Sequence, residues 1–193
     1  MRSEVSVYRA KYALRRALDR AAFLARLDPN AISVAVLVPS ALVAISLVFG
    51  WWIVAALGVL GRMFLSTLDG YVAETYGKKT RLGAYLNRAV AQVGDAIILV
   101  SLVARADPPW VALVIAGAWL ADALAFLGAL AGGTLQWGGP AAQADRLTVI
   151  LAAALLALVL PIDWTIVCEI LAALLVLTIA GRLWRAGREL AGS

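Results

Sequence analysis

Histidine is absent from the 193 residues, and cysteine occurs once, at Cys168. The lack of histidine excludes His-based zinc sites, Ser-His-Asp catalysis and imidazole proton shuttles, and a single thiol cannot form an internal disulfide. Charged residues are also scarce: they make up 15% of the chain against 63% hydrophobic residues, and the mean hydropathy is +0.89. A soluble domain of this size needs more polar surface, so the sequence predicts an integral membrane protein.

Six apolar stretches are long enough to cross a hydrocarbon core, which needs roughly 20 helical residues. They predict an all-α integral membrane fold in which residues 1–193 form one membrane domain. The fifth stretch is short, and its helix is expected to extend back into 141–146. The expected spans lie near 31–50, 52–73, 83–104, 110–133, 147–161 and 164–182.

Lysine and arginine are concentrated before the first span, in the loop at 74–82 and after the last span, whereas the opposite connections hold only Arg105. By the positive-inside rule, both termini and the 74–82 loop are expected on the cytoplasmic side of the cytoplasmic (inner) membrane. The net charge of +5 thus reflects membrane orientation and contact with anionic lipid. Because no aromatic residues are interleaved with the basic ones, no nucleic-acid partner is predicted.

Residues 4–27 show a helical repeat of apolar residues, with arginines on much of the opposite side. This pattern predicts an amphipathic juxtamembrane helix in the headgroup layer, and a disordered basic tail is the alternative. Further along, Pro39 is expected to kink the first span.

Polar side chains follow one stripe on each of the second and third spans. Arg62, Ser66 and Asp69 recur at spacings of three and four, and Asn87 and Asp95 lie eight residues apart. Because the two spans run antiparallel, Asp69 should face Asn87, and Arg62 should face Asp95. Polar groups at these depths are costly unless they meet each other or a water-filled cavity. We interpret Arg62 and Asp95 as a structural ion pair and the remainder as the candidate site.

The spacing of this ladder resembles the signature of the CDP-alcohol phosphotransferase (CDP-alcohol phosphatidyltransferase) family, D-x2-D-G-x2-A-R-x8-G-x3-D-x3-D. In that family, four aspartates hold divalent metal ions against a CDP-linked donor, and the last one activates the acceptor hydroxyl. Here three of the four aspartates and the arginine are replaced. The matching positions are Ser66, Asp69, Gly70, Ala73, Glu74, Gly83, Asn87 and Ala91.

The resemblance implies roles for these positions in this chain. Mg²⁺ or Mn²⁺ would be held by Asp69, Ser66 and Asn87, and the CDP-linked donor would contact Gly70, Ala73, Gly83, Ser66 and Asn87. Asp69 and Glu74 are the candidate catalytic carboxylates, while Ala91 offers no base. An alternative to the Arg62–Asp95 pair is that Arg62 bends inward and occupies the vacated metal position. Arg146, in an Asp-Arg pair before the fifth span, resembles a residue that binds an anionic acceptor.

Two functions follow from the resemblance. In the first, the protein transfers a phosphatidyl-type group from a CDP-linked lipid donor to an alcohol and releases CMP. In the second, it has lost the metal site and binds membrane lipid or a partner protein; a homodimer is implied in either case. A third hypothesis, a small transporter that uses the intramembrane acids Asp122 and Glu169, has no supporting motif.

Overall fold

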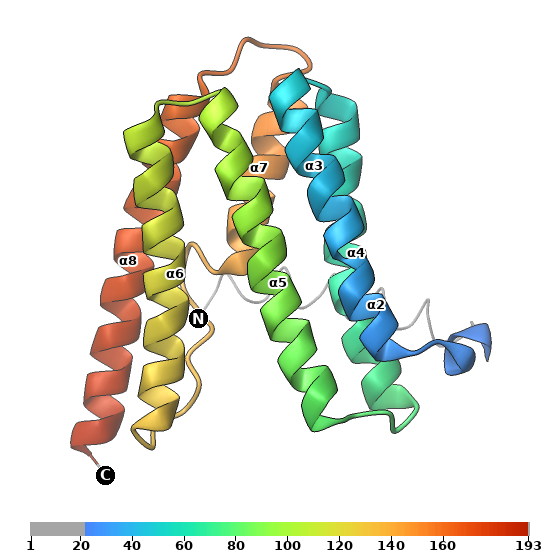
Figure 1. Cartoon of the computed structure of the whole chain (residues 1–193). Helices are drawn as coiled ribbons and strands as arrows, with labels where there is room; N and C mark the ends of the chain where they lie inside the picture. The colour runs from blue at the N-terminus through green and yellow to red at the C-terminus, as the bar shows by residue number, and fades with distance from the viewer. Residues whose placement is uncertain (1–21, 193) are drawn as a thin grey trace.

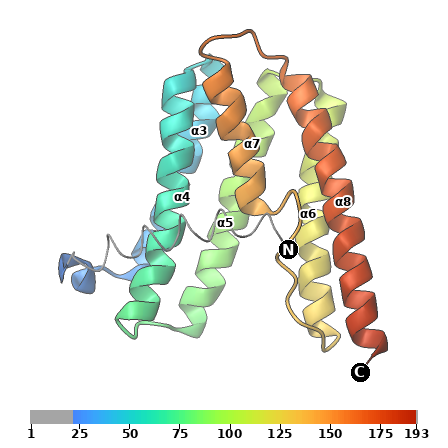
Figure 2. The same ribbon diagram turned by 180° about the vertical axis from the view of Figure 1, so that it is seen from behind.

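The chain forms a bundle of helices in the computed structural model, which describes residues 22–192 (Figure 1 and Figure 2). No strand occurs in this part of the chain, as the all-α prediction requires. Short 3-10 helices are η1 (Ala22–Arg26) and η2 (Leu102–Ala104). The α-helices are α2 (Pro29–Ala35), α3 (Leu37–Phe49), α4 (Trp52–Thr75), α5 (Arg81–Ser101), α6 (Pro108–Leu130), α7 (Gln143–Leu156) and α8 (Trp164–Ala191).

Five segments of the described chain are long and apolar enough to cross a membrane, which indicates an integral membrane protein. Each lies within a few residues of a predicted span, except that the last extends nine residues past the predicted end at 182. The five are Pro29–Phe49, Trp52–Thr75, Arg81–Ala104, Pro108–Leu130 and Trp164–Ala191.

The first span is interrupted at Val36, between α2 and α3. Pro39 has no backbone N–H to donate to the carbonyl of Ala35, and its ring crowds that carbonyl. The proline therefore accounts for the break one turn before it. At the start of α2, the Asp28 side chain accepts a hydrogen bond from the Asn30 backbone N–H (3.0 Å), which caps the helix.

The predicted fifth span at 147–161 differs most from the structure. Helix α7 does begin upstream, at Gln143, but it has 14 residues and is too short to cross a membrane alone. The preceding segment, residues 131–142, rises without helix from one end of the bundle to its middle (Figure 1 and Figure 2). Gly132 and Gly139 have positive φ angles of 99° and 153°, and Pro140 adds a second obstacle to helix.

The predicted amphipathic helix at 4–27 lies mostly outside the described residues. Of this range, Ala22–Arg26 is the short helix η1, and Leu24 packs in a small apolar cluster with Ile32, Leu68 and Tyr71. The beginning of the described chain is thus attached to α2 and α4.

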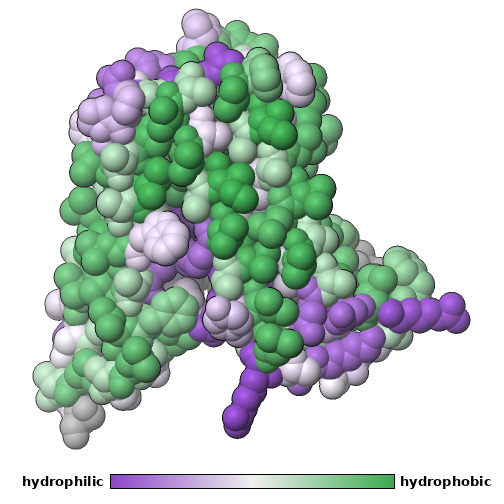
Figure 3. Space-filling model, viewed as in Figure 1, coloured by the Kyte–Doolittle hydropathy of each residue, from purple (hydrophilic) through white to green (hydrophobic). Residues whose placement is uncertain are grey.

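The main apolar core occupies one half of the bundle, the upper half in Figure 1, and includes Leu47, Val59, Ile98, Val114 and Leu171. Helix α4 packs on α2, α3 and α7, and α5 packs on α2 and α3, whereas α4 and α5 make little direct contact. Apolar side chains cover most of the face seen in Figure 3, and hydrophilic ones gather toward the lower end and in a recess there. The polar ladder lies between α4 and α5, where these two helices make little direct contact.

Candidate functional site

Asp69 is the centre of the polar ladder and is 3% exposed. Its Oδ2 accepts hydrogen bonds from Asn87 Nδ2 (2.7 Å) and from Ser33 Oγ (2.6 Å), and its Oδ1 accepts one from the Gly70 backbone N–H (2.5 Å). Asp69 and Asn87 are therefore in contact across the two helices, as predicted. Ser33, on α2, was not predicted; a hydroxyl one turn after Pro29 in an apolar stretch is the signal that could have identified it.

An outer cavity of about 290 Å³ opens beside Asp69, at the end of the bundle where α4 joins α5. Four positions to which the resemblance assigns donor binding line it: Gly70, Ala73, Gly83 and Asn87. Three cationic side chains line the same cavity: Lys78, Lys79 and Arg88. The outer cavity therefore combines small residues, which leave room for a ligand, with positive charge.

An inner cavity of about 410 Å³ shares Ser33, Asp69 and Asn87 with the outer one. Ser66 and Ala91, the remaining aspartate positions of the signature, also line it. The rest of its wall is largely apolar and includes Leu60, Met63, Phe64 and Leu147. Leu60 and Phe64 are also exposed on the outside of the bundle, so the inner cavity adjoins a surface suited to lipid chains.

Glu74 does not join Asp69. Its side chain is 48% exposed and pairs with Lys79 at 3.1 Å, and it lines neither cavity. Glu74 lies one residue beyond the stripe of Asp69 and Ala73, which turns it about 100° away around the helix. The structure thus separates the two carboxylates to which we assigned catalysis.

The residues present do not fit the two divalent ions implied by the resemblance. Mg²⁺ and Mn²⁺ take oxygen ligands, normally several carboxylates, and residues 22–192 contain no group of three or more His, Cys, Asp or Glu placed to share an ion. Asp69 is the single carboxylate of the two cavities. Its oxygens already accept hydrogen bonds from Ser33, Gly70 and Asn87.

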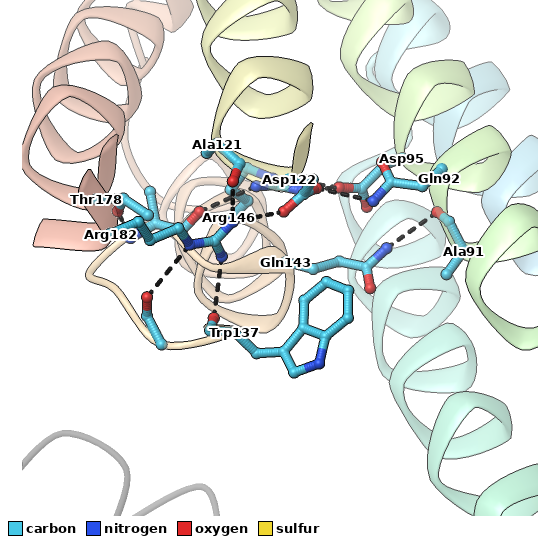
Figure 4. Close-up of polar contacts among 12 residues, drawn as sticks. Ala91, Gln92, Asp95, Ala121, Asp122, Trp137, Gln143, Arg146, Thr178 and Arg182 are labelled. Atoms are coloured by element: carbon cyan, nitrogen blue, oxygen red, sulfur yellow. Dashed lines mark hydrogen bonds and ion pairs between the residues drawn. The ribbon is translucent and has the colours of Figure 1, made fainter. Parts of the chain in front are cut away.

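A second polar assembly connects five buried charged side chains. Figure 4 shows four of them: Asp95, Asp122, Arg146 and Arg182. The Asp95 carboxylate forms ion pairs with the guanidinium groups of Arg62 (2.8 Å) and Arg146 (2.6 Å). The Asp122 carboxylate forms ion pairs with those of Arg146 (3.3 Å) and Arg182 (3.0 Å). We call these five residues the buried ion-pair network. The predicted pair of Arg62 and Asp95 is its first link, and the network ties α4, α5, α6, α7 and α8 together.

Arg146 occupies the middle of this network. It is 1% exposed, and its Nε, Nη1 and Nη2 donate to Asp95, to the Ala141 carbonyl and to Asp122. It lines neither cavity. These contacts give Arg146 a structural role, because its donors are directed at protein groups; the acceptor binding suggested by the resemblance stays a prediction.

Two arginines of α8 donate hydrogen bonds to backbone carbonyls of the non-helical segment 131–142. Arg182 donates to the carbonyls of Ala121, Trp137 (3.0 Å) and Gly138 (3.4 Å), and Arg185 donates to Gly138 (2.8 Å). Irregular backbone at membrane depth is tolerated only where protein or a cavity supplies its hydrogen bonds. Through Arg182, the buried ion-pair network therefore also holds the segment that precedes α7.

Gly83 and Gly70 line the same cavity but have different surroundings. A Cβ atom on Gly83 would lie 2.7 Å from Asn30 Oδ1 and 3.0 Å from Thr80 Oγ1, whereas one on Gly70 would meet nothing within 4 Å. The close approach at Gly83 is thus to α2 and to its own N-cap residue rather than to α4. The open space at Gly70 is available to a ligand.

We expect Gly83→Ala to lower the free energy of unfolding by about 1 kcal/mol, because it displaces Asn30 and the Thr80 cap. Gly70→Ala is the matched control and should raise stability by roughly 0.5–1 kcal/mol, since alanine favours helix and meets no obstacle. Thermal unfolding of the two variants in detergent measures the difference. Equal shifts of the same sign would contradict the assigned contacts.

Three comparisons with known proteins bear on this site. A family model described as CDP-alcohol phosphatidyltransferase matches residues 26–184. A search of curated proteins finds none that matches. Two crystal structures of Mycobacterium tuberculosis phosphatidylinositol phosphate synthase (PgsA1) are similar in fold, each at 20% identity. The one with CDP-DAG bound has a TM-score of 0.73 and covers 92% of this chain and 94% of its own. The one with manganese and citrate has a TM-score of 0.71 and covers 91% and 88%.

Proposed function

Because the chain belongs to the CDP-alcohol phosphatidyltransferase family, we propose that it binds a CDP-linked lipid around Asp69 and does not transfer the phosphatidyl group. One observation carries the proposal. The outer cavity keeps Gly70, Ala73, Gly83 and Asn87 together, while the site has a single carboxylate where the signature needs four.

Loss of transfer is inferred from the position of Ala91. The resemblance assigns the activation of the acceptor hydroxyl to this position, and a methyl group cannot accept a proton. The side chain that contacts Ala91 is a cation, since Arg62 Nη2 donates to the Ala91 backbone carbonyl at 3.0 Å. A guanidinium has no lone pair to accept the proton of an acceptor hydroxyl, so Arg62 does not replace the missing base.

The shape of the two cavities supports a lipid ligand. The outer cavity offers polar and cationic groups, and the inner one offers an apolar wall that reaches the exposed Leu60 and Phe64. An amphipathic ligand can thus place its headgroup in one and part of its chains along the other. The similar mycobacterial structure was determined with CDP-DAG bound, which makes CDP-diacylglycerol the first ligand to test.

A transferase with an atypical site is the second candidate. It is favoured by Asp69, Ser66 and Asn87, which line one cavity and offer three oxygen-bearing side chains to Mg²⁺ or Mn²⁺. It needs a further carboxylate, and Glu74 would have to leave Lys79 and turn toward Asp69. The homodimer inferred from the resemblance and the inner-membrane location remain predictions under both candidates.

Thermal unfolding and CMP release, measured on the same purified sample, distinguish the candidates. CDP-diacylglycerol at about a hundred times its dissociation constant should stabilise the protein by about 2.7 kcal/mol. Diacylglycerol, which lacks the nucleotide, is the control and should give a much smaller shift. We expect no CMP release above background with any alcohol acceptor. Metal-dependent CMP release that Asp69→Asn abolishes would establish the transferase instead.

A further inference from the structure

We propose that the site holds the diphosphate of its lipid ligand without a divalent metal ion, using Arg62, Lys79 and Arg88 in place of the metal. This inference rests on the proposed function, since it concerns how the same ligand is bound. It follows from the disagreement between the side chains of the two cavities and the metal set implied by the family signature.

The balance of charge is reversed relative to the signature. Four cationic side chains line the two cavities, Arg62, Lys78, Lys79 and Arg88, together with one acid, Asp69. A site with four carboxylates repels a diphosphate until metal ions neutralise it. A site with this set of cations attracts the diphosphate directly.

Arg62 is the cation at the inner end. It is 1% exposed and lines the inner cavity. Its Nε donates to Ser40 Oγ (3.0 Å), and its Nη2 donates to the Ala91 carbonyl and to Asp95. Nη1 takes no part in these bonds, so its two N–H groups remain for a phosphate oxygen, while Asp95 and Ser40 fix the guanidinium plane.

Lys79 and Arg88 are the cations at the outer end. Lys79 is 68% exposed and pairs with Glu74, a surface contact of the kind that contributes little and exchanges readily. Arg88 lies over the Trp137 ring, 4.8 Å from its centre, which orients the guanidinium and leaves its N–H groups to donate. Lys78 differs, because its Nζ donates to the carbonyls of Ala25 and Leu27 at 2.7 Å. It therefore serves mainly to hold the chain before α2.

The two cavities share Ser33, Asp69 and Asn87, so a ligand can extend from Lys79 and Arg88 toward Arg62. A diphosphate carries more anionic oxygens than a monophosphate, so it offers more hydrogen-bond acceptors to these cations. The charge of the lining thus favours a nucleoside-diphosphate lipid over a simple acidic phospholipid.

The test is the affinity of the full chain in lipid nanodiscs for CDP-diacylglycerol, in EDTA and in Mn²⁺. We expect dissociation constants that agree within about twofold, and weaker binding of both phosphatidic acid and soluble CDP. Binding that appears only with Mn²⁺ would overturn this inference and leave the proposed function intact. Absence of binding in both conditions would overturn the two together.

Variants at the outer end test the cations without disturbing the buried ion-pair network. Lys79→Gln and Arg88→Gln should each weaken metal-free binding by roughly tenfold or more, as expected for one charge-assisted hydrogen bond. Arg81→Gln is the matched control: it removes the same charge from an exposed residue of the same region that lines neither cavity. If Lys79→Gln and Arg88→Gln bind as tightly as Arg81→Gln, the inference is wrong.

Discussion

Asp95→Asn is expected to lower the free energy of unfolding by about 3–5 kcal/mol, because it leaves buried Arg62 without a counter-ion and buried Arg146 with Asp122 alone. Asp95 receives Arg62 on one oxygen and Arg146 on the other, and both arginines are 1% exposed. An asparagine in its place keeps the shape and removes the charge. Loss of this residue should therefore disturb α4, α5 and α7 at once.

The measurement is thermal or denaturant unfolding in detergent, with Asp107→Asn as the matched control. Asp107 is an exposed residue just before α6, and its side chain makes no capping hydrogen bond, so the same chemical change should cost less than about 0.5 kcal/mol there. A similar small effect at both positions would show that the buried ion-pair network does not stabilise the fold.

Replacing Arg62 and Asp95 together also tests whether these residues act as an isolated ion pair or as part of a network. For an isolated pair, apolar replacement of both residues is close to neutral. Here the double change leaves Arg146 with Asp122 alone, and Asp122 is already shared with Arg182. We therefore expect the double variant to remain strongly destabilised, and a mild effect would favour the simple pair.

Much of the fold could be predicted from the sequence because apolar runs of about 20 residues have few alternatives in a bilayer. Five spans, the break near Pro39 and the facing of Asp69 and Asn87 follow from hydropathy, proline chemistry and helical spacing. The course of residues 131–142 does not follow from these features. Several of its hydrogen bonds come from α8, among them those of Arg182 and Arg185, which are more than 40 residues away in the sequence.

The polar stripes on α4 and α5 could be predicted from the sequence, but the site residue on α2 could not. Spacing along one helix brings Arg62, Ser66 and Asp69 to one side, but it does not show which other helices face that side. Ser33 enters from α2, and only the packing of α4 against that helix reveals it. The exposed position of Glu74 likewise depends on the end of α4 being open to solvent.

Restoring the lost carboxylates should convert the site into a metal site. In the triple variant Ser66→Asp, Asn87→Asp and Ala91→Asp, three new carboxylates join Asp69 around the inner cavity. Without metal, the variant should be less stable than the wild type, since Asp69 loses the hydrogen bond from Asn87 and gains like charges. Mn²⁺ at about a hundred times its dissociation constant should then stabilise the variant by about 2.7 kcal/mol.

The matched control carries Ser66→Asn and Ala91→Asn with Asn87 retained, which supplies side chains of the same shape without charge. We expect Mn²⁺ to change the unfolding temperature of the triple aspartate variant alone, and to leave the control and the wild type unchanged. An equal shift in all three would mean that the ion binds through Asp69 and neutral oxygens, and that carboxylate number is not what separates this chain from the signature. A shift confined to the triple variant would show that the scaffold around Asp69 still accepts a metal ion. The loss of carboxylates at residues 66, 87 and 91 would then be the change that removed the metal site from this chain.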